Sequence, residues 1–297
     1  MTPAERGFLL LSSHLGDPER KPLTSSQLRT LGQRMQMMEK PDQDRELEAK
    51  DLASLGYRPE VANRILHLLN DEDLLRYYIN KGKSFGCIPV TRVSGGYPLL
   101  LRKRLGLDSP GVLWAKGDLS LLSEPTVSLV GSRELQNENR AFAEEVGRQA
   151  ALQGYVLVSG NARGADKAAQ NACLKNGGRV ISVVADELVK QPLLERVLYL
   201  SEDGYSETFS SQRALSRNRV IHALGTRTFV AQSGLKIGGT WDGTVKNLRF
   251  CWSGVWCYDD GSEAMKLLAS MGANLIHMED LNSFYDLPET EQIKMDR

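Results

Sequence analysis

The sequence predicts an α/β fold in which a parallel sheet is covered by helices and preceded by a small helical domain. From residue 126 onward, short apolar runs rich in β-branched residues recur, namely "TVSLVG", "GYVLVS", "GRVISVV" and "TRTFVAQ". Segments with helical patterning lie between most of these runs. Strands that are buried on both faces and alternate with helices are typical of a parallel sheet. We therefore expect a helical N-terminal domain over residues 1–85, the α/β domain over 86–280 and a C-terminal tail over 281–297.

Helical periodicity defines the elements between the strands and before them. "LTSSQLRTLGQRMQMM" and "EVANRILHLLNDEDLLRYYI" place apolar residues three and four positions apart, which predicts one helix in each. In the α/β domain, Phe142, Val146 and Ala150 line one face of an amphipathic helix that ends at Gly154. A further helix is expected to begin near Ala165, and its small side chains allow it to approach the sheet closely.

The composition excludes several classes of function. Lys and Arg together number 37, and so do Asp and Glu, so any binding site for an anion must be local. No apolar run is long enough to span a bilayer, and we expect a cytoplasmic protein. The four cysteines and four histidines show no metal-ligand spacing, so we expect neither a metal nor a cofactor.

Glycine-rich turns follow the predicted strands and carry the candidate binding residues. Ser132 and Arg133 stand after the first strand, in "SLVGSRE". In the next turn, "VSGNARGAD", Gly160 and Gly164 lack side chains, so a phosphate could reach the backbone, and Arg163 could pair with it. In an open α/β sheet, ligands bind at the carboxyl ends of the strands.

The role of Asp166 in the second turn stays open between two readings. Its carboxylate either caps the free amides of the helix that begins there, a structural role, or accepts a hydrogen bond from a hydroxyl group. The sequence also allows the carboxylate to orient Arg163 by an ion pair instead.

Two later segments extend the same edge of the sheet. "QRALSRNRVIHALG" contains Arg213, Arg217, Asn218 and Arg219, and the first two share a helix face at a spacing of four, so their charges could converge. "AQSGLKIGGTWDGT" is a fourth strand, glycine and helix sequence, in which Lys236 is a candidate contact. Together the four turns predict one glycine-lined groove with a local set of cations.

Several ordered motifs resemble the DNA processing protein A family, DprA or Smf. They are "VSLVGSRE", "LVSGNARGADKAAQNACL", "LSRNRVIHALG" and "GSEAMKLLASMGANLI", with an upstream segment that begins at "IPVTRVSGGYPLLLRKR". The resemblance covers about residues 85 to 277. It implies an extended Rossmann-like domain that binds single-stranded DNA in a basic pocket, often as a homodimer, and passes the strand to the recombinase RecA. By motif, the DNA-binding role falls on the GSR, SGNARG and SRNR residues.

This chain departs from the family pattern at Gln170, at Gln232 and in the turn "GLKIGGTWDG". We expect no winged-helix module after "GANLIHMEDLNSFYDL", so the contact with RecA and the dimer geometry stay open. The glycine-rich turn also resembles a wider group of nucleotide-binding proteins that includes phosphoribohydrolases and nucleotide-sensing defence proteins. The reading favoured by the residues is a non-enzymatic protein that binds single-stranded DNA, and the alternative is a nucleotide sensor or nucleotide hydrolase.

Overall fold

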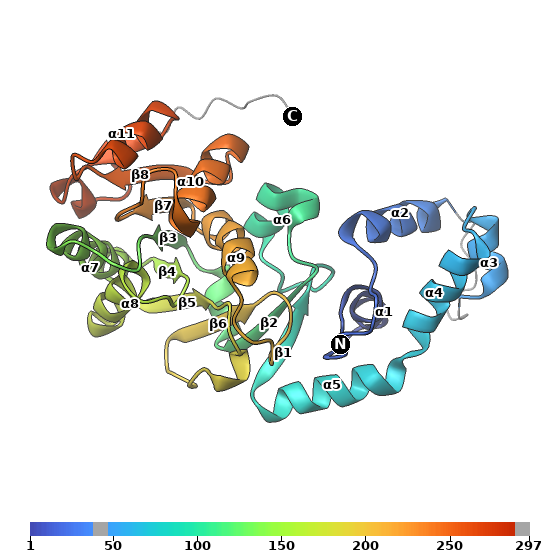
Figure 1. Ribbon diagram of the computed structural model, residues 1–297. Coiled ribbons are helices and arrows are strands. Elements are labelled where there is room, and N and C mark those ends of the chain that lie inside the picture. Colours follow the sequence, from blue (N-terminus) through green and yellow to red (C-terminus); the bar gives the residue numbers. More distant parts are fainter. Residues whose placement is uncertain (38–46, 289–297) are drawn as a thin grey trace.

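The computed structural model describes residues 1–37 and 47–288, and the α/β fold class predicted from the sequence is confirmed (Figure 1). In the described part of the chain, one nine-stranded sheet contains the strands β1 (Cys87–Thr91), β2 (Val112–Gly117), β3 (Thr126–Val130), β4 (Val156–Ser159), β5 (Arg179–Val183), β6 (Val197–Ser201), β7 (Arg227–Val230), β8 (Gly254–Tyr258) and β9 (Asn274–Ile276). The helices are α1 (Pro3–Ser12), α2 (Ser25–Gln36), α3 (Ala49–Ser54), α4 (Pro59–Asn70), α5 (Glu72–Ser84), α6 (Leu99–Leu105), α7 (Asn137–Leu152), α8 (Ala165–Lys175), α9 (Ser211–Leu224), α10 (Gly238–Phe250) and α11 (Glu263–Ser270).

The order of the strands places a topological switch at the centre of the sheet. The order is β1-β2-β6-β5-β4-β3-β7-β8-β9, and every pair from β6 to β9 is parallel, whereas β1 and β2 join as antiparallel strands. From β3 the chain adds strands on one side and then returns to add β7 on the other. A crevice opens outside the carboxyl ends of the strands at such a switch, here after β3 and β7.

Helices cover both faces of the sheet. One apolar core joins strand residues such as Leu129 and Leu157 to α7 and α8, and it also takes in Leu9 from α1. The other core packs α6, α9, α10 and α11 against residues such as Val158 and Val230. Alternate residues of β4 therefore enter opposite cores, which explains why the sequence of this strand is apolar without interruption.

The N-terminal helices form a third apolar cluster and also join the core of the sheet. Three aromatic rings connect the two parts of the chain: Tyr78 of α5 stacks on Tyr205 with centroids 4.3 Å apart and meets the edge of Trp114 at 5.1 Å. The Tyr205 hydroxyl donates to the backbone oxygen of Tyr78 over 2.9 Å. This contact joins α5 to the α/β part of the chain, so the structure does not separate the two parts at residue 85. The domain boundary there stays a prediction.

One expectation about a single element needs correction. The segment 60–79 forms two helices rather than one, because α4 ends before Asp71 and α5 begins after it. The Asp71 carboxylate accepts from the buried Arg20 guanidinium at 3.0 Å, which fixes the chain at the break. Leu281, Phe284 and Leu287, just beyond residue 280, are buried in the core that α7 and α8 share, and the boundary at 280 stays a prediction.

Candidate functional site

Two adjoining cavities lie at the carboxyl edge of the sheet, where the strand order predicts a crevice. The first, which we call the turn cavity, has a volume of about 280 Å³ and is lined by the turns after β3, β4 and β5. The second, the α9–α10 cavity, has a volume of about 400 Å³ and is lined by residues of both helices and by the loop after β7. Arg133 and Arg217 line both cavities, so the two adjoin across these side chains.

Arg217 is a buried cation with unused hydrogen-bond donors. Its exposed fraction is 8%, and its Nη2 atom lies 3.8 Å from Oδ2 of Asp166. Its Nε and Nη1 atoms have no hydrogen-bond partner among the residues that the structure describes. Burial lowers the pKa of Arg217, and the Asp166 carboxylate opposes that shift. Buried donors without partners are costly, so an anion that enters either cavity would be stabilised by them.

Asp166 holds the turn and Arg217, and it does not cap α8. Its Oδ2 atom accepts from the backbone amide of Ala162, in the preceding turn, at 3.1 Å. Burial raises the pKa of the Asp166 carboxyl, and Arg217 opposes that shift. Arg163 is not its partner: that side chain is 77% exposed and reaches Glu134 at 3.2 Å. The ion pair considered from the sequence therefore forms with Arg217 instead of Arg163.

The two glycines of the second turn are surrounded so closely that neither position could take a side chain, and contact of a phosphate with their backbone stays a prediction. A Cβ atom on Gly160 would lie 1.3 Å from Nη1 of Arg217, so the guanidinium already fills that space. A Cβ atom on Gly164 would lie 2.4 Å from the backbone oxygen of Ser132, and its φ is +88°. Both glycines are needed by the packing of the turns. At the first residue of α10, by contrast, Gly238 has a φ of +87° and nothing within 4 Å of the Cβ position, so its backbone is open.

The cations of α9 have separate partners and do not converge. Nη1 of Arg213 donates to three backbone oxygens, those of Ala185, Glu207 and Thr208. Arg219 pairs with Glu202 at 2.6 Å and lines a different cavity, between α1 and β2. Their internal partners explain both side chains without a ligand.

Asn218 and Ser132 lie at the α9–α10 cavity and also connect protein segments. The Asn218 amide donates to the backbone oxygen of Gly239 at 3.0 Å, and Ser132 Oγ donates to that of Gln232 at 3.2 Å. Lys236 is exposed in the loop before α10, in the left-handed region with a φ of 55°.

An exposed aromatic ring that the sequence reading missed completes the turn cavity. Phe209 is 52% exposed, and the Arg133 guanidinium lies 5.8 Å from the centroid of its ring. Arg133 makes no hydrogen bond or ion pair with the rest of the described chain. The signal in the sequence was a single Phe in the polar stretch "SETFSSQ", just before α9.

The two glutamines that depart from the family pattern have internal partners. The Gln170 amide is buried and donates to Ser159 Oγ at 2.6 Å and to Ser182 Oγ at 3.2 Å. The Gln232 side-chain oxygen accepts from the backbone amide of Gln136 at 3.0 Å, at the start of α7. Both side chains therefore stabilise the edge of the sheet beneath the cavities.

Within residues 1–37 and 47–288, no group of three or more His, Cys, Asp or Glu side chains is arranged to hold a metal ion. In the same ranges, no helix combines the length and the apolar character needed to cross a membrane.

Comparison with known proteins gives a consistent result. The family model of DNA recombination-mediator protein A matches residues 89–281, more than half of the chain. The DNA processing protein DprA of Streptococcus pneumoniae is 34% identical over 145 residues, which cover 44% of this chain and 50% of that protein. DprA of Bacillus subtilis is 30% identical over 167 residues, covering 51% and 53%. The chain thus matches about half the length of these curated relatives.

The solved structures extend the likeness to nearly the whole chain. DNA processing protein A from Streptococcus pneumoniae superposes with a TM-score of 0.74 at 25% identity, covering 97% of this chain and 100% of that one. The Helicobacter pylori protein of the same name has the same fold, with a TM-score of 0.56 at 22% identity, covering 66% and 94%. The resemblance found in the sequence motifs is confirmed: the chain belongs to the DNA recombination-mediator protein A family.

Proposed function

We propose that this protein binds single-stranded DNA at the carboxyl edge of its sheet, through phosphate groups held in the turn cavity and the α9–α10 cavity. The observation that supports this most directly is Arg217, whose buried and unpartnered donors lie between the two cavities. The open backbone of Gly238, at the start of an α-helix without a side-chain cap, adds free amide groups that favour an anion.

Phe209 supports a single strand as the ligand. An exposed ring beside an unpaired arginine offers a base a stacking surface and its phosphate a charge. In a duplex the bases are already stacked, so such a ring would stay unused. The related Helicobacter pylori protein has a known mode of single-stranded DNA binding, which agrees with this proposal.

The family description favours a role in recombination. We propose that the bound strand is passed to a RecA-type recombinase in the cytoplasm, and that the protein does so without catalysing a reaction. The test is the rate at which such a recombinase forms filaments on DNA covered by single-strand-binding protein, with and without this chain. An unchanged rate would contradict the loading role and leave DNA binding itself untouched.

The binding site is tested by Arg133→Gln. Because Arg133 has no internal ion pair, its loss should leave the melting temperature unchanged, lower the affinity for an oligothymidylate and reduce the salt slope by about 0.7. Arg249→Gln is the matched control, since Arg249 is also exposed and lies over an aromatic ring, Phe250, at 5.4 Å. Equal binding by the two variants would disprove the proposed site.

A small nucleotide is the second candidate ligand, because the volume of the α9–α10 cavity, about 400 Å³, suits one. No carboxylate is among the described residues that line this cavity, which disfavours a hydrolase with an acidic catalytic residue. A competition experiment distinguishes the two candidate ligands. If a mononucleotide displaces the oligonucleotide at micromolar concentration, and if the binding affinity hardly changes with salt, the protein is a nucleotide sensor.

A further inference from the structure

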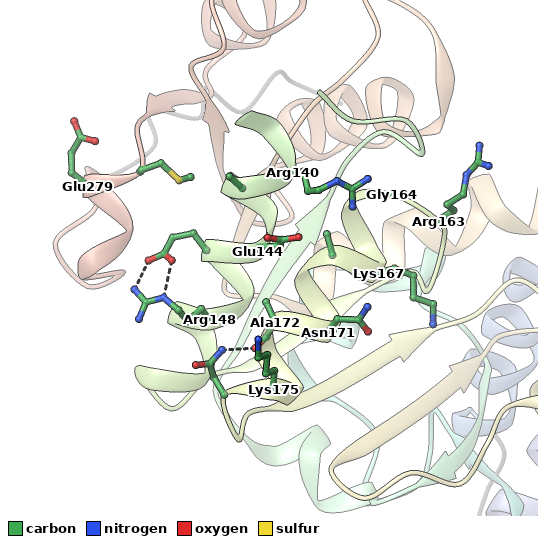
Figure 2. Close-up of a pocket in the computed structure, with 15 residues that line it drawn as sticks. Arg140, Glu144, Arg148, Arg163, Gly164, Lys167, Asn171, Ala172, Lys175 and Glu279 are labelled. Carbon is green, nitrogen blue, oxygen red and sulfur yellow. Dashed lines mark hydrogen bonds and ion pairs between the residues drawn. The ribbon is translucent and has the colours of Figure 1, made fainter. Parts of the chain in front are cut away.

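A long groove runs between α7 and α8 and begins at the candidate site. This α7–α8 groove has a volume of about 1150 Å³ and is shown in Figure 2. Arg163 and Gly164 line its upper end, and Arg163 also lines the turn cavity. A chain that leaves the turn cavity past Arg163 would therefore enter this groove.

One side of the groove carries uncompensated positive charge. Lys167, Asn171 and Lys175 are spaced by four residues on α8, so they share one face at intervals of about 6 Å along the helix. Arg140 faces the groove from α7. Neither Arg140 nor Lys175 forms an ion pair within the described ranges, and the Lys167 ammonium donates only to the side-chain oxygen of Asn161.

The negative charges lie along α7 and in the segment that follows β9. Glu145 accepts two hydrogen bonds from Arg148, at 2.8 and 2.6 Å, and these two charges compensate each other. Glu144, also on α7, and Glu279 have exposed carboxylates that would repel a polyanion. A phosphate chain in the groove is thus confined to the α8 side.

The floor of the groove is made of small residues. Ala141, Ala168 and Ala172 line it, and none of the described residues in the lining has an aromatic ring on which a base could stack. Contacts there would be made to phosphates and would not depend on base sequence.

We propose that the α8 side of this groove, with Arg140, binds the phosphates of the single strand that continues past Arg163. The proposal rests on the proposed function. It predicts a second segment of the binding site that acts through charge alone. A strand just long enough to fill the turn cavity and the α9–α10 cavity would not reach this segment, whereas a longer strand would.

The test compares two oligothymidylates. One of about 6 nucleotides is short enough to occupy the two cavities alone, and one of about 20 nucleotides is long enough to continue into the groove. The variant Arg140→Gln/Lys167→Gln/Lys175→Gln removes three cations. For the longer strand, the salt slope should fall by about 2, and the affinity at low salt by about tenfold or more. Binding of the shorter strand should not change.

The matched control is Arg76→Gln/Lys81→Gln/Lys83→Gln, which removes the same charge from α5, a helix packed on the edge strand β1. An equal loss in this control, or a loss for both strand lengths, would show a general charge effect and overturn the proposal. The proposal would also be overturned if the groove variant bound the longer strand with unchanged affinity. Arg133→Gln distinguishes failure of the proposed function from failure of the groove proposal. If Arg133→Gln weakens the binding of both strands and the groove variant weakens the binding of neither, the proposed function stands and only the groove is excluded as a DNA site.

Discussion

At the scale of single residues, Arg217 determines the form of the second glycine-rich turn. Its guanidinium occupies the space above Gly160, and its partner Asp166 holds the amide of Ala162. The turn therefore leaves space for the Arg217 guanidinium and holds it in place, and this guanidinium is the group that would bind a phosphate. This dependence makes two substitutions informative.

Gly160→Ala should displace Arg217, because the new methyl group would lie within bonding distance of Nη1. We expect a loss of about 2 kcal/mol or more in the free energy of unfolding and a large loss of oligonucleotide affinity. Urea unfolding and a binding titration measure both. Gly7→Ala is the control, since nothing lies within 4 Å of that position. Full stability of the Gly160 variant would show that Arg217 can move away freely.

Asp166→Asn should separate stability from binding. The amide oxygen can still accept from Ala162, but Arg217 loses its buried counter-ion, so we expect a loss of about 2 to 3 kcal/mol in stability. A phosphate no longer competes with the carboxylate for the guanidinium, so the oligonucleotide affinity should rise. Melting with and without oligonucleotide measures both effects. Unchanged stability would mean that the carboxyl group is already protonated in the folded protein, the direction in which burial shifts its pKa.

The sequence predicted which residues gather at the edge, but not how they are used. Arg133 and Arg217 follow from the position of their motifs after strands. The internal partners of Arg213 and Arg219 could not all be predicted, because the backbone oxygens of Ala185 and Asp108 come from segments distant in the sequence. The same holds for Gly160, since the side chain that needs its missing Cβ lies 57 positions later, at residue 217.

At the scale of elements, the four parallel strands predicted from apolar runs are all present, as β3, β4, β5 and β7. The segments of β2 and β6 are also apolar, but nothing local in them specifies an antiparallel pairing between residues that lie more than 80 positions apart, such as Gly117 and Leu198. The break at Asp71 was hidden because α4 and α5 continue the same apolar spacing on either side of it.

The contact between α7 and α8 depends on one glycine. A Cβ atom on Gly147 would lie 2.1 Å from the backbone oxygen of Ala169, so the two helices touch there through their backbones. The small residues of α8 thus allow close approach to α7 as well as to the sheet.

Gly147→Ala should force these helices apart and destabilise the fold by about 1 to 3 kcal/mol, although alanine favours a helix more than glycine does. Thermal melting measures the change. The Gly7→Ala variant of α1 should instead be as stable as the parent or slightly more so. Equal behaviour of the two variants would disprove the close contact.

At the scale of the whole molecule, stability should depend on pH through His222. This side chain is fully buried, and burial lowers its pKa to about 3. Its Nδ1 lies 3.1 Å from the Asn247 amide nitrogen, so Nδ1 accepts and the ring is neutral. In the unfolded chain the pKa is about 6.5, so below that pH the unfolded state binds a proton that the folded state does not.

The stability is therefore complete above about pH 6.5 and falls as the pH decreases toward 3. Between about pH 6.5 and pH 5 the loss from this residue should be about 2 kcal/mol. Urea unfolding at both pH values measures it. His222→Gln can keep a bond to Asn247 without titrating, so its pH dependence should be weaker by that amount. An identical dependence in both proteins would assign the effect to other groups.

The aromatic contact between the N-terminal helices and the sheet has an optical consequence. Trp114 is 1% exposed and contacts both rings of the stacked pair formed by Tyr78 of α5 and Tyr205. If the helices separate from the sheet, water reaches the indole and its fluorescence emission shifts to longer wavelength. With Trp241, Trp252 and Trp256 replaced by phenylalanine, the emission of this single indole would report whether the helices detach before the sheet melts or in the same cooperative step.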